Sequence, residues 1–283
     1  MRPDIEMLVG AAREGDRRAL EELVLEIQDK IYGLALRMLY DPSDAEDASQ
    51  EILLKIITHL GTFRGESAFS TWMYRVAANH LLTVRKRRAE REAMSFEEYE
   101  EDLDVDSARN WRESQSAALQ NLFVEEIRIS CLQGLLLCLD RGHRLAFLLV
   151  DVFDVSSEQG ADILGITPAA FRKRLSRARK RLRDFLTRNC GLVDPDNPCT
   201  CAYHVASQLD SGRFDDQNVI FANHPCRART EIKQGGSGQD LVREMDELNQ
   251  VGALYKRALD FHAPAVFLEN IRGLVSSGEY ELL

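Results

Sequence analysis

The sequence predicts an all-α protein with two small helical domains, an acidic linker between them, and a mainly helical C-terminal extension. Apolar residues recur at three- and four-residue spacings through most of the chain, which is typical of amphipathic helices. Capping residues, prolines and glycines break this pattern at intervals. The breaks divide the chain into a first unit at 1–90, a linker at 91–118, a second unit at 119–188 and a tail at 189–283.

The composition is that of a soluble globular protein. Of the 283 residues, 45% are hydrophobic and 29% are charged. No apolar run approaches the roughly 18–20 residues that a membrane span needs. The N-terminus lacks a basic segment followed by an apolar one, so no signal peptide is expected. We therefore expect a cytoplasmic protein with no membrane partner.

The charges are segregated along the chain. The net charge of −10, taken alone, argues against a nucleic-acid partner. However, binding responds to the local field rather than to the sum of the charges. Basic residues gather at 85–88 and at 172–183, and acidic residues gather at 97–106. This segregation leaves two basic segments that could bind DNA.

The first unit has the pattern of three helices. One face of the first helix consists of Val24, Ile27, Ile31, Leu34 and Met38. Ser43 and Glu46 form a capping box that predicts a second helix from about Asp44 to Gly61. A loop at 62–67 leads to a third helix, which carries Phe69 and Trp72 inward and finishes in the basic cluster at 85–88. The linker that follows has too few apolar residues for a core of its own.

The second unit ends in a helix–turn–helix pattern. Ser156 with Gln159 caps a short helix, and Gly165 follows it. Thr167 suits an N-cap and Pro168 suits the first helical position, so a second helix runs from Pro168 to about Leu186. Its apolar face would pack on the preceding helix, and this face consists of Phe171, Leu175, Ala178, Leu182 and Phe185.

The opposite face of that last helix is basic. It carries Arg172, Lys173, Ser176, Arg177 and Lys180. An α-helix fits the DNA major groove, where arginine suits guanine and lysine suits phosphate. A merely solvated amphipathic helix would show the same charges. The turn residues upstream favour DNA binding over that simpler interpretation.

Three motifs resemble one protein family. The stretch SDAEDASQE at 43–51 resembles the "DAEDxxQE" motif of sigma-factor region two. Phe63-Arg64 and FSTWMYRVAAN at 69–79 look like the "F-R…F-x-T-W-L-Y-R-I-A-x-N" of the same region. FRKRLSRAR at 171–179 is similar to the "VKSRLxRAR" of region four. In this order and with a short linker, they resemble the extracytoplasmic-function (ECF) sigma factors of bacterial RNA polymerase, in the sigma-70 superfamily.

The resemblance implies partners and roles. Region two would bind core RNA polymerase and melt the −10 promoter element, and region four would read the −35 element as duplex. An anti-sigma factor would be a further partner, and the holoenzyme would associate with the nucleoid. Polymerase contacts are expected at Asp44, Asp47, Gln50 and Glu51. Contacts to the −10 element are expected at Phe63, Arg64, Arg75, Asn79, Arg85, Arg87 and Arg88. Contacts to the −35 element are expected at Ala169, Arg172, Lys173, Ser176, Arg177 and Lys180.

The tail carries clustered cysteines. In a cytoplasmic protein, such clusters suggest metal or redox chemistry before structural disulfides. A site for zinc or another metal could consist of Cys190, Cys199 and Cys201, with Cys226 or His224. A redox dithiol and thiols without function are the alternatives. We expect no required cofactor, and we interpret Cys131 and Cys138 as ordinary buried thiols.

Several interpretations stay open at this stage. The tail could control the chain in cis through its metal or thiol state, or it could be a structural extension that contacts polymerase or the sigma domains. The whole chain could be a stand-alone helix-turn-helix regulator that binds DNA as a dimer, or a metal sensor that works through its tail. No nucleophile–base pair, phosphate-binding loop or paired-carboxylate motif supports catalysis, so no enzyme is expected. His80 and His143 are expected to be structural or solvated.

Overall fold

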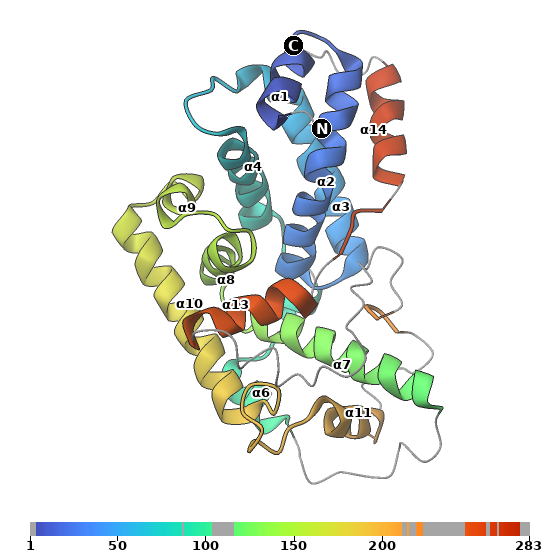
Figure 1. Cartoon of the computed structure of the whole chain (residues 1–283), viewed down its shortest axis with the longest axis vertical. Helices are drawn as coiled ribbons and strands as arrows, with labels where there is room; N and C mark the ends of the chain where they lie inside the picture. The colour runs from blue at the N-terminus through green and yellow to red at the C-terminus, as the bar shows by residue number, and fades with distance from the viewer. Residues whose placement is uncertain are drawn as a thin grey trace.

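The chain folds into helices (Figure 1). The computed structural model describes residues 4–86, 88–103, 116–210, 214, 219–222, 247–258, 261–264 and 266–277. Within these ranges the regular secondary structure is helical, so the all-α prediction is confirmed. The backbones of Cys190 and Cys199 form an isolated β-bridge, and both thiols are free. No helix in the described ranges combines the length and the apolar character that crossing a bilayer requires.

The first unit is a bundle of four helices and one short 3₁₀ turn. Its elements are α1 (Ile5–Arg13), α2 (Arg17–Leu39), α3 (Pro42–Thr58), η1 (Leu60–Thr62) and α4 (Phe69–Thr83). The predicted apolar face of α2 is fully buried, from Val24 to Met38. The predicted capping box at Ser43 is wrong. Asp41 is the N-cap, and its side chain accepts a hydrogen bond from Asp44 N at 3.0 Å, because Pro42 occupies the favourable first helical position.

The start of the linker is ordered, which its acidic composition did not predict. The short helix α5 (Arg88–Arg91) leads into it, and α6 (Phe96–Glu101) lies within it. The rings of Phe96 and Tyr99 lie 5.8 and 5.7 Å from the ring of Phe185 in the second unit. Two aromatic side chains therefore anchor this segment to the second unit.

The second unit contains α7 (Ala117–Leu137), α8 (Arg141–Phe147), the π-helical turn η3 (Leu148–Val152), α9 (Ser157–Ile163) and α10 (Pro168–Asn189). The capping box of Ser156 and Gln159 is present, and Thr167 caps α10 with Pro168 at its start. These predictions are confirmed, as is the buried face of α10 from Phe171 to Phe185. Gly165 turns the chain between α9 and α10 with a φ of +60°, a conformation that glycine adopts at no steric cost.

The contact between α9 and α10 depends on a glycine. A Cβ atom at Gly160 would overlap the ring of Phe171, with Cε2 at 2.6 Å. We expect Gly160→Ala to lower the free energy of unfolding by about 1–3 kcal/mol, because overpacking forces the two helices apart. Urea unfolding followed by circular dichroism would measure the loss. Gly10→Ala is the control, since nothing lies within 4 Å of that position and α1 should be slightly stabilised. Equal effects of the two substitutions would contradict the packing argument.

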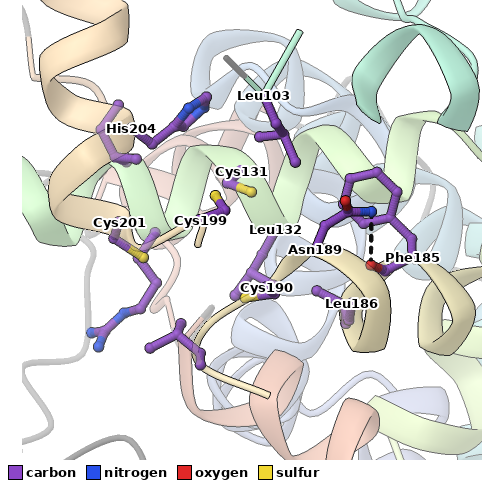
Figure 2. A pocket seen from close by; sticks show the side chains of 13 residues that line it. Leu103, Cys131, Leu132, Phe185, Leu186, Asn189, Cys190, Cys199, Cys201 and His204 are labelled. Carbon is purple, nitrogen blue, oxygen red and sulfur yellow. Dashed lines mark hydrogen bonds between the residues drawn. The ribbon is translucent and has the colours of Figure 1, made fainter. Parts of the chain in front are cut away.

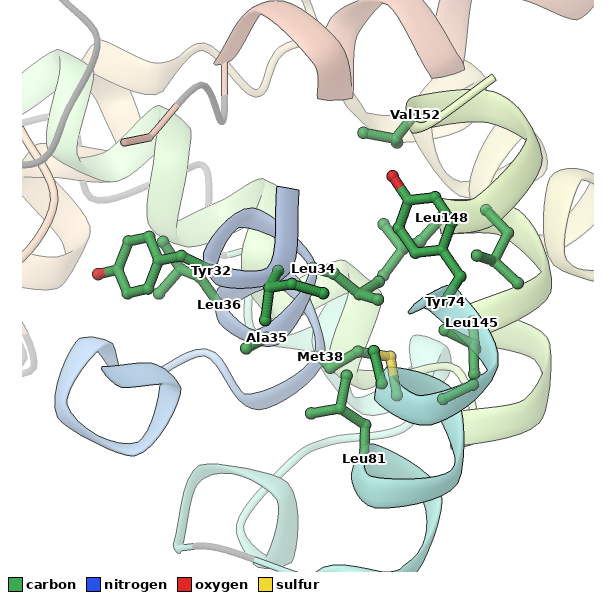
Figure 3. Close-up of a cluster of buried hydrophobic side chains, with 14 of the residues drawn as sticks. Tyr32, Leu34, Ala35, Leu36, Met38, Tyr74, Leu81, Leu145, Leu148 and Val152 are labelled. Carbon is green, nitrogen blue, oxygen red and sulfur yellow. The ribbon is translucent and has the colours of Figure 1, made fainter. Parts of the chain in front are cut away.

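The two units share one hydrophobic core. Figure 3 shows residues of α2 and α4, such as Met38 and Tyr74, facing Leu145 and Leu148 of the second unit. A buried ion pair lies at the same junction. Arg144 approaches Glu90 at 3.3 Å, and it also donates hydrogen bonds to Met38 O and Leu136 O. The two units therefore pack on each other, and we call this the closed arrangement.

The tail packs against both units. Its helices are α11 (Cys201–Asp210), α13 (Glu247–Ala258) and α14 (Val266–Ser277). In Figure 1, α13 crosses the second unit and α14 runs beside α2. Tyr255 of α13 is fully buried, with its ring 5.3 Å from that of Phe147. Phe267 of α14 packs its ring 6.0 Å from that of Tyr32. The tail thus bridges the two units.

Candidate nucleic-acid interface

Helix α10 presents the basic face that the sequence predicts. The described side chains that were expected to contact duplex DNA are all exposed: Ala169, Arg172, Lys173, Ser176, Arg177 and Lys180. Thr167 caps the first turn of α10, since its Oγ1 accepts a hydrogen bond from Ala170 N at 3.2 Å. The N-terminal turns of α10 can therefore enter a major groove while the opposite face stays in the core.

The basic residues of α10 differ in how they are engaged. Arg179 makes a bidentate ion pair with the buried Asp151, at 2.9 to 3.1 Å. Lys180 pairs with Asp184 at 2.5 Å. Among the described residues, no carboxylate lies within ion-pair distance of Arg172 or Arg177. Arg179 is thus a structural residue, while the N-terminal arginines are available to an external partner.

Helix α3 carries the predicted acidic surface. Asp47 and Glu51 are exposed, and Asp44 and Gln50 are half-buried. These four residues point away from the buried face of α3, which packs into the first unit. A surface with these carboxylates suits a basic protein partner.

The loop before α4 holds an aromatic cluster rather than a free ring. Phe63 is only 5% exposed, and its ring lies 5.6 Å from that of Phe69 and 5.7 Å from that of Trp72. The sequence predicts Phe63 in a loop, where it could stack on a base. It does lie between η1 and α4, but its ring faces the core because two aromatic residues of α4 receive it. Arg64, the next residue, is exposed.

Helix α4 supplies the other predicted contacts of the first unit. Asn79 is exposed, as expected for a polar residue on the outer side of the helix. Arg85 and Arg88 are exposed beyond its end, and Arg87 lies outside the described residues. Arg75 is engaged: its guanidinium lies 2.5 Å from Asp162 of α9. Sequence reasoning missed this acceptor, because nothing local marks Asp162 as a partner of a residue 87 positions earlier.

The junction between the units adds two aromatic contacts to that ion pair. Phe153, just after η3, packs its ring 5.7 Å from that of Tyr74. The guanidinium of Arg37 lies over the Phe153 ring, 5.5 Å from its centroid. It also donates a hydrogen bond to Gly33 O at 2.8 Å. The surface of α4 that carries Arg75 is therefore partly occupied by the second unit in this closed arrangement.

The tail cysteines lie near a thiol of the second unit. Cys190, Cys199 and Cys201 line one cavity, and Cys131 of α7 and His204 of α11 line it too. The other candidate ligands, Cys226 and His224, lie outside the described residues. The interpretation of Cys131 as an ordinary buried thiol overlooked this neighbourhood, which only the packing of α7 against α11 creates. Cys138 lies at the C-terminal cap of α7 and donates to Gly134 O at 3.5 Å.

The two units match two described families. Residues 23–92 match the family described as Sigma-70 region 2, and residues 129–182 match the family described as Sigma-70, region 4. The first match covers α2 to α5, and the second covers the end of α7 to most of α10. The last residues of α10 and the tail lie outside both matches.

Curated relatives match the same part of the chain. The RNA polymerase sigma-H factor of Pseudomonas aeruginosa is 34% identical over 180 residues, which are 62% of this chain and 91% of that protein. The ECF RNA polymerase sigma-E factor of Haemophilus influenzae is 31% identical and is covered to 92%. The ECF RNA polymerase sigma-E factor of Escherichia coli is 30% identical and is covered to 91%.

Two solved structures are also similar. CnrH, solved in complex with the cytosolic domain of CnrY, is 20% identical with a TM-score of 0.45, over 65% of this chain and 98% of that chain. The sigma factor RpoE of Bartonella quintana, solved in complex with the anti-sigma factor NepR, is 20% identical with a TM-score of 0.39. That match covers 58% of this chain and 94% of the other.

Proposed function

The chain belongs to the ECF sigma factors of the sigma-70 family, and we propose on this basis that it recruits core RNA polymerase to promoters by recognising −35 and −10 elements. One observation carries the proposal: the two family matches fall, in family order, on two helical units with exposed basic and acidic faces of the required kind. The chain would act by binding alone, with no active site of its own. Its place of action would be the cytoplasm, at the nucleoid when it is part of the holoenzyme.

The second unit would read the −35 element. Its exposed N-terminal residues on α10 would face base edges, with Arg172 and Arg177 as hydrogen-bond donors to guanine. Lys173 and Lys180 would bind phosphates, and Ala169 and Ser176 are small enough to let the helix approach the groove. The free guanidinium groups at the start of α10 support this assignment.

The first unit would open and hold the −10 element. Asn79 would read an unpaired base, while Arg64, Arg75, Arg85, Arg87 and Arg88 would bind the backbone. Stacking by Phe63 would require its ring to leave Phe69 and Trp72. The exposed carboxylates of α3, above all Asp47 and Glu51, would bind a basic surface of core polymerase. The family further suggests an anti-sigma factor as a partner that competes for these surfaces.

The tail would control these activities in cis. It contacts both units: the Glu126 carboxylate of α7 accepts hydrogen bonds from the backbone N–H groups of Ile220, Phe221 and Ala222 at 2.7–3.0 Å. At the other end, Arg272 pairs with Glu21 of α2 at 2.7 Å. An element fixed to both units favours the closed arrangement, in which Arg75 is paired with Asp162. Release of the tail would favour the open one.

Run-off transcription tests the central proposal. Core polymerase would be assayed with and without the purified full chain, on a promoter selected from random sequence by the reconstituted holoenzyme. We expect new start sites only when the chain is present. If the chain selects DNA alone and core polymerase neither binds it nor initiates with it, the stand-alone regulator would replace the sigma factor.

The arginines at the start of α10 give a sharper test. We expect Arg172→Ala and Arg177→Ala each to weaken holoenzyme binding to the selected promoter by about 10- to 100-fold, because a lost bidentate base contact costs about 1–3 kcal/mol. Selectivity at the contacted base pair should relax as well. Arg181→Ala is the matched control, since Arg181 is exposed on the same helix but lies farther from its N-terminus. It should weaken binding to all sequences equally, if at all. A uniform loss in all three variants would contradict base reading by Arg172 and Arg177.

A further inference from the structure

Four of the six cysteines of the chain line one small cavity (Figure 2). They come from three segments: Cys131 from the middle of α7, Cys190 from the C-cap of α10, and Cys199 and Cys201 from the approach to α11. The cavity holds about 30 Å³. That is enough for a single ion or water but far below the several hundred Å³ of an organic ligand site. The cavity therefore has room for an ion or a water and not for an organic ligand.

The segment from Cys190 to Cys201 is built to present sulfur atoms. Gly191 N donates to Cys199 O at 2.9 Å, and a Cβ atom at Gly191 would lie only 3.0 Å from that oxygen. Glycine thus permits the close approach that pairs Cys190 with Cys199. The backbone N–H groups of Val193 and Asp194 turn back and donate to Cys190 O at 3.0 Å, which fixes the backbone on both sides of this cysteine.

We propose that four thiols bind one metal ion: Cys131, Cys190, Cys199 and Cys201. Zinc is the expected ion, because four cysteine ligands are typical of structural zinc sites. Each thiol would release its proton to solvent as its sulfur binds the ion. Arg128, which also lines the cavity, would offset part of the resulting negative charge. The fourth ligand would be Cys131 of α7, the first helix of the second unit. It would take the place that the sequence assigns to Cys226 or His224 of the tail.

Metal binding would tighten the cavity. Within the described residues, no three histidine, cysteine or acidic side chains already converge on a common point at ligand distance. The four thiols would therefore have to rotate inward, drawing the Cys190–Cys201 segment and α11 onto α7. This would fasten the tail to the second unit. The inference concerns metal binding alone, and it can be tested without polymerase or promoter.

The test uses the full chain, stripped of metal by a chelator under reducing conditions. We expect it to take up one zinc ion per chain by mass spectrometry of the metal, and cobalt to give the sulfur-to-cobalt charge-transfer bands of thiolate coordination. Cys131→Ser, Cys190→Ser, Cys199→Ser and Cys201→Ser should each lower zinc affinity by more than about 100-fold, since even outer partners of ligands contribute 10–100-fold. Cys138→Ser is the matched control on α7, because that thiol does not line the cavity. It should bind zinc like the unmodified chain.

Three outcomes would overturn the site. The first is no uptake of zinc or cobalt by the folded chain. The second is loss of binding in Cys226→Ser with none in Cys131→Ser, which would place the metal within the tail alone. The third is a Cys190–Cys199 disulfide in the chain as isolated from cells, since it would show that these thiols serve redox chemistry. A chain that binds zinc but does not support transcription would leave this inference intact and remove the proposed function.

Discussion

Replacing Arg144 with methionine is expected to lower the free energy of unfolding by about 3–5 kcal/mol, because it removes the guanidinium that donates to several buried carbonyls and leaves Arg141 alone to pair with the buried Glu90 carboxylate. Arg144 is 3% exposed, and it donates to Leu136 O at 2.8 Å and to Leu139 O at 3.0 Å. It also reaches Glu90 and the Met38 carbonyl of the first unit. Burial lowers its pKa to about 10, and Glu90 counteracts that effect, so the side chain remains charged at neutral pH. Urea unfolding monitored by circular dichroism would measure the loss.

A second arginine–glutamate pair provides the control. Arg88 and Glu92 form an ion pair at 3.0 Å on the surface of α5, and both side chains are largely exposed. Arg88→Met should cost less than about 1 kcal/mol, because solvent screens an exposed pair. If Arg144→Met proved no more destabilising than Arg88→Met, the buried pair would have no special role in holding the two units together.

Removing the ring of Tyr255 is expected to open the molecule. The side chain is fully buried between the tail and the second unit, and its hydroxyl donates to Leu132 O at 3.0 Å. Loss of a buried aromatic side chain costs about 3–5 kcal/mol, and Tyr255 is a fully buried anchor of α13. Tyr255→Ala should therefore release α13, increase the radius of gyration in small-angle scattering, and raise the affinity for core polymerase by about tenfold or more.

Two further variants make this prediction decisive. Tyr255→Phe keeps the ring and loses only the hydrogen bond, so it should shift the same quantities weakly. The double variant Lys256→Glu and Arg272→Glu reverses the charge of the tail partners of Asp154 and Glu21 without a cavity in the core, so it should favour release of the tail modestly, since solvent screens both pairs. If the chain opened in these variants and its affinity for polymerase did not change, control by the tail in cis would be ruled out.

The sequence predicted what depends on neighbours in the chain. The basic and apolar faces of α10 follow from helical periodicity, and its start at Thr167 and Pro168 follows from capping chemistry. The same local rules misplaced the start of α3, because two candidate caps, Asp41 and Ser43, stand side by side and the intervening Pro42 favours the first. Local rules thus locate a helix well and its first residue less well.

The remaining features depend on contacts between distant parts of the chain. Phe63 is buried because Phe69 and Trp72 receive its ring, and Arg75 is paired because α9 packs against α4. No periodicity in the sequence encodes either contact. Cys131 is the strongest case: it stands in an apolar helical pattern, and only the tertiary fold brings it to the cavity that Cys201 lines. The family resemblance, which ends before the tail, gave no guidance there.

The position of Arg179 on α10 has a mechanical consequence. At 22 residues, α10 is an unbroken rod about 33 Å long, with the groove-facing residues at one end and Cys190 at the other. Arg179 grips Asp151 close to the midpoint of this rod, which makes that contact a fulcrum. Because the helix is unbroken, a shift imposed at Cys190 would be carried along its axis to the residues at its N-terminus, which are the ones expected to meet the bases.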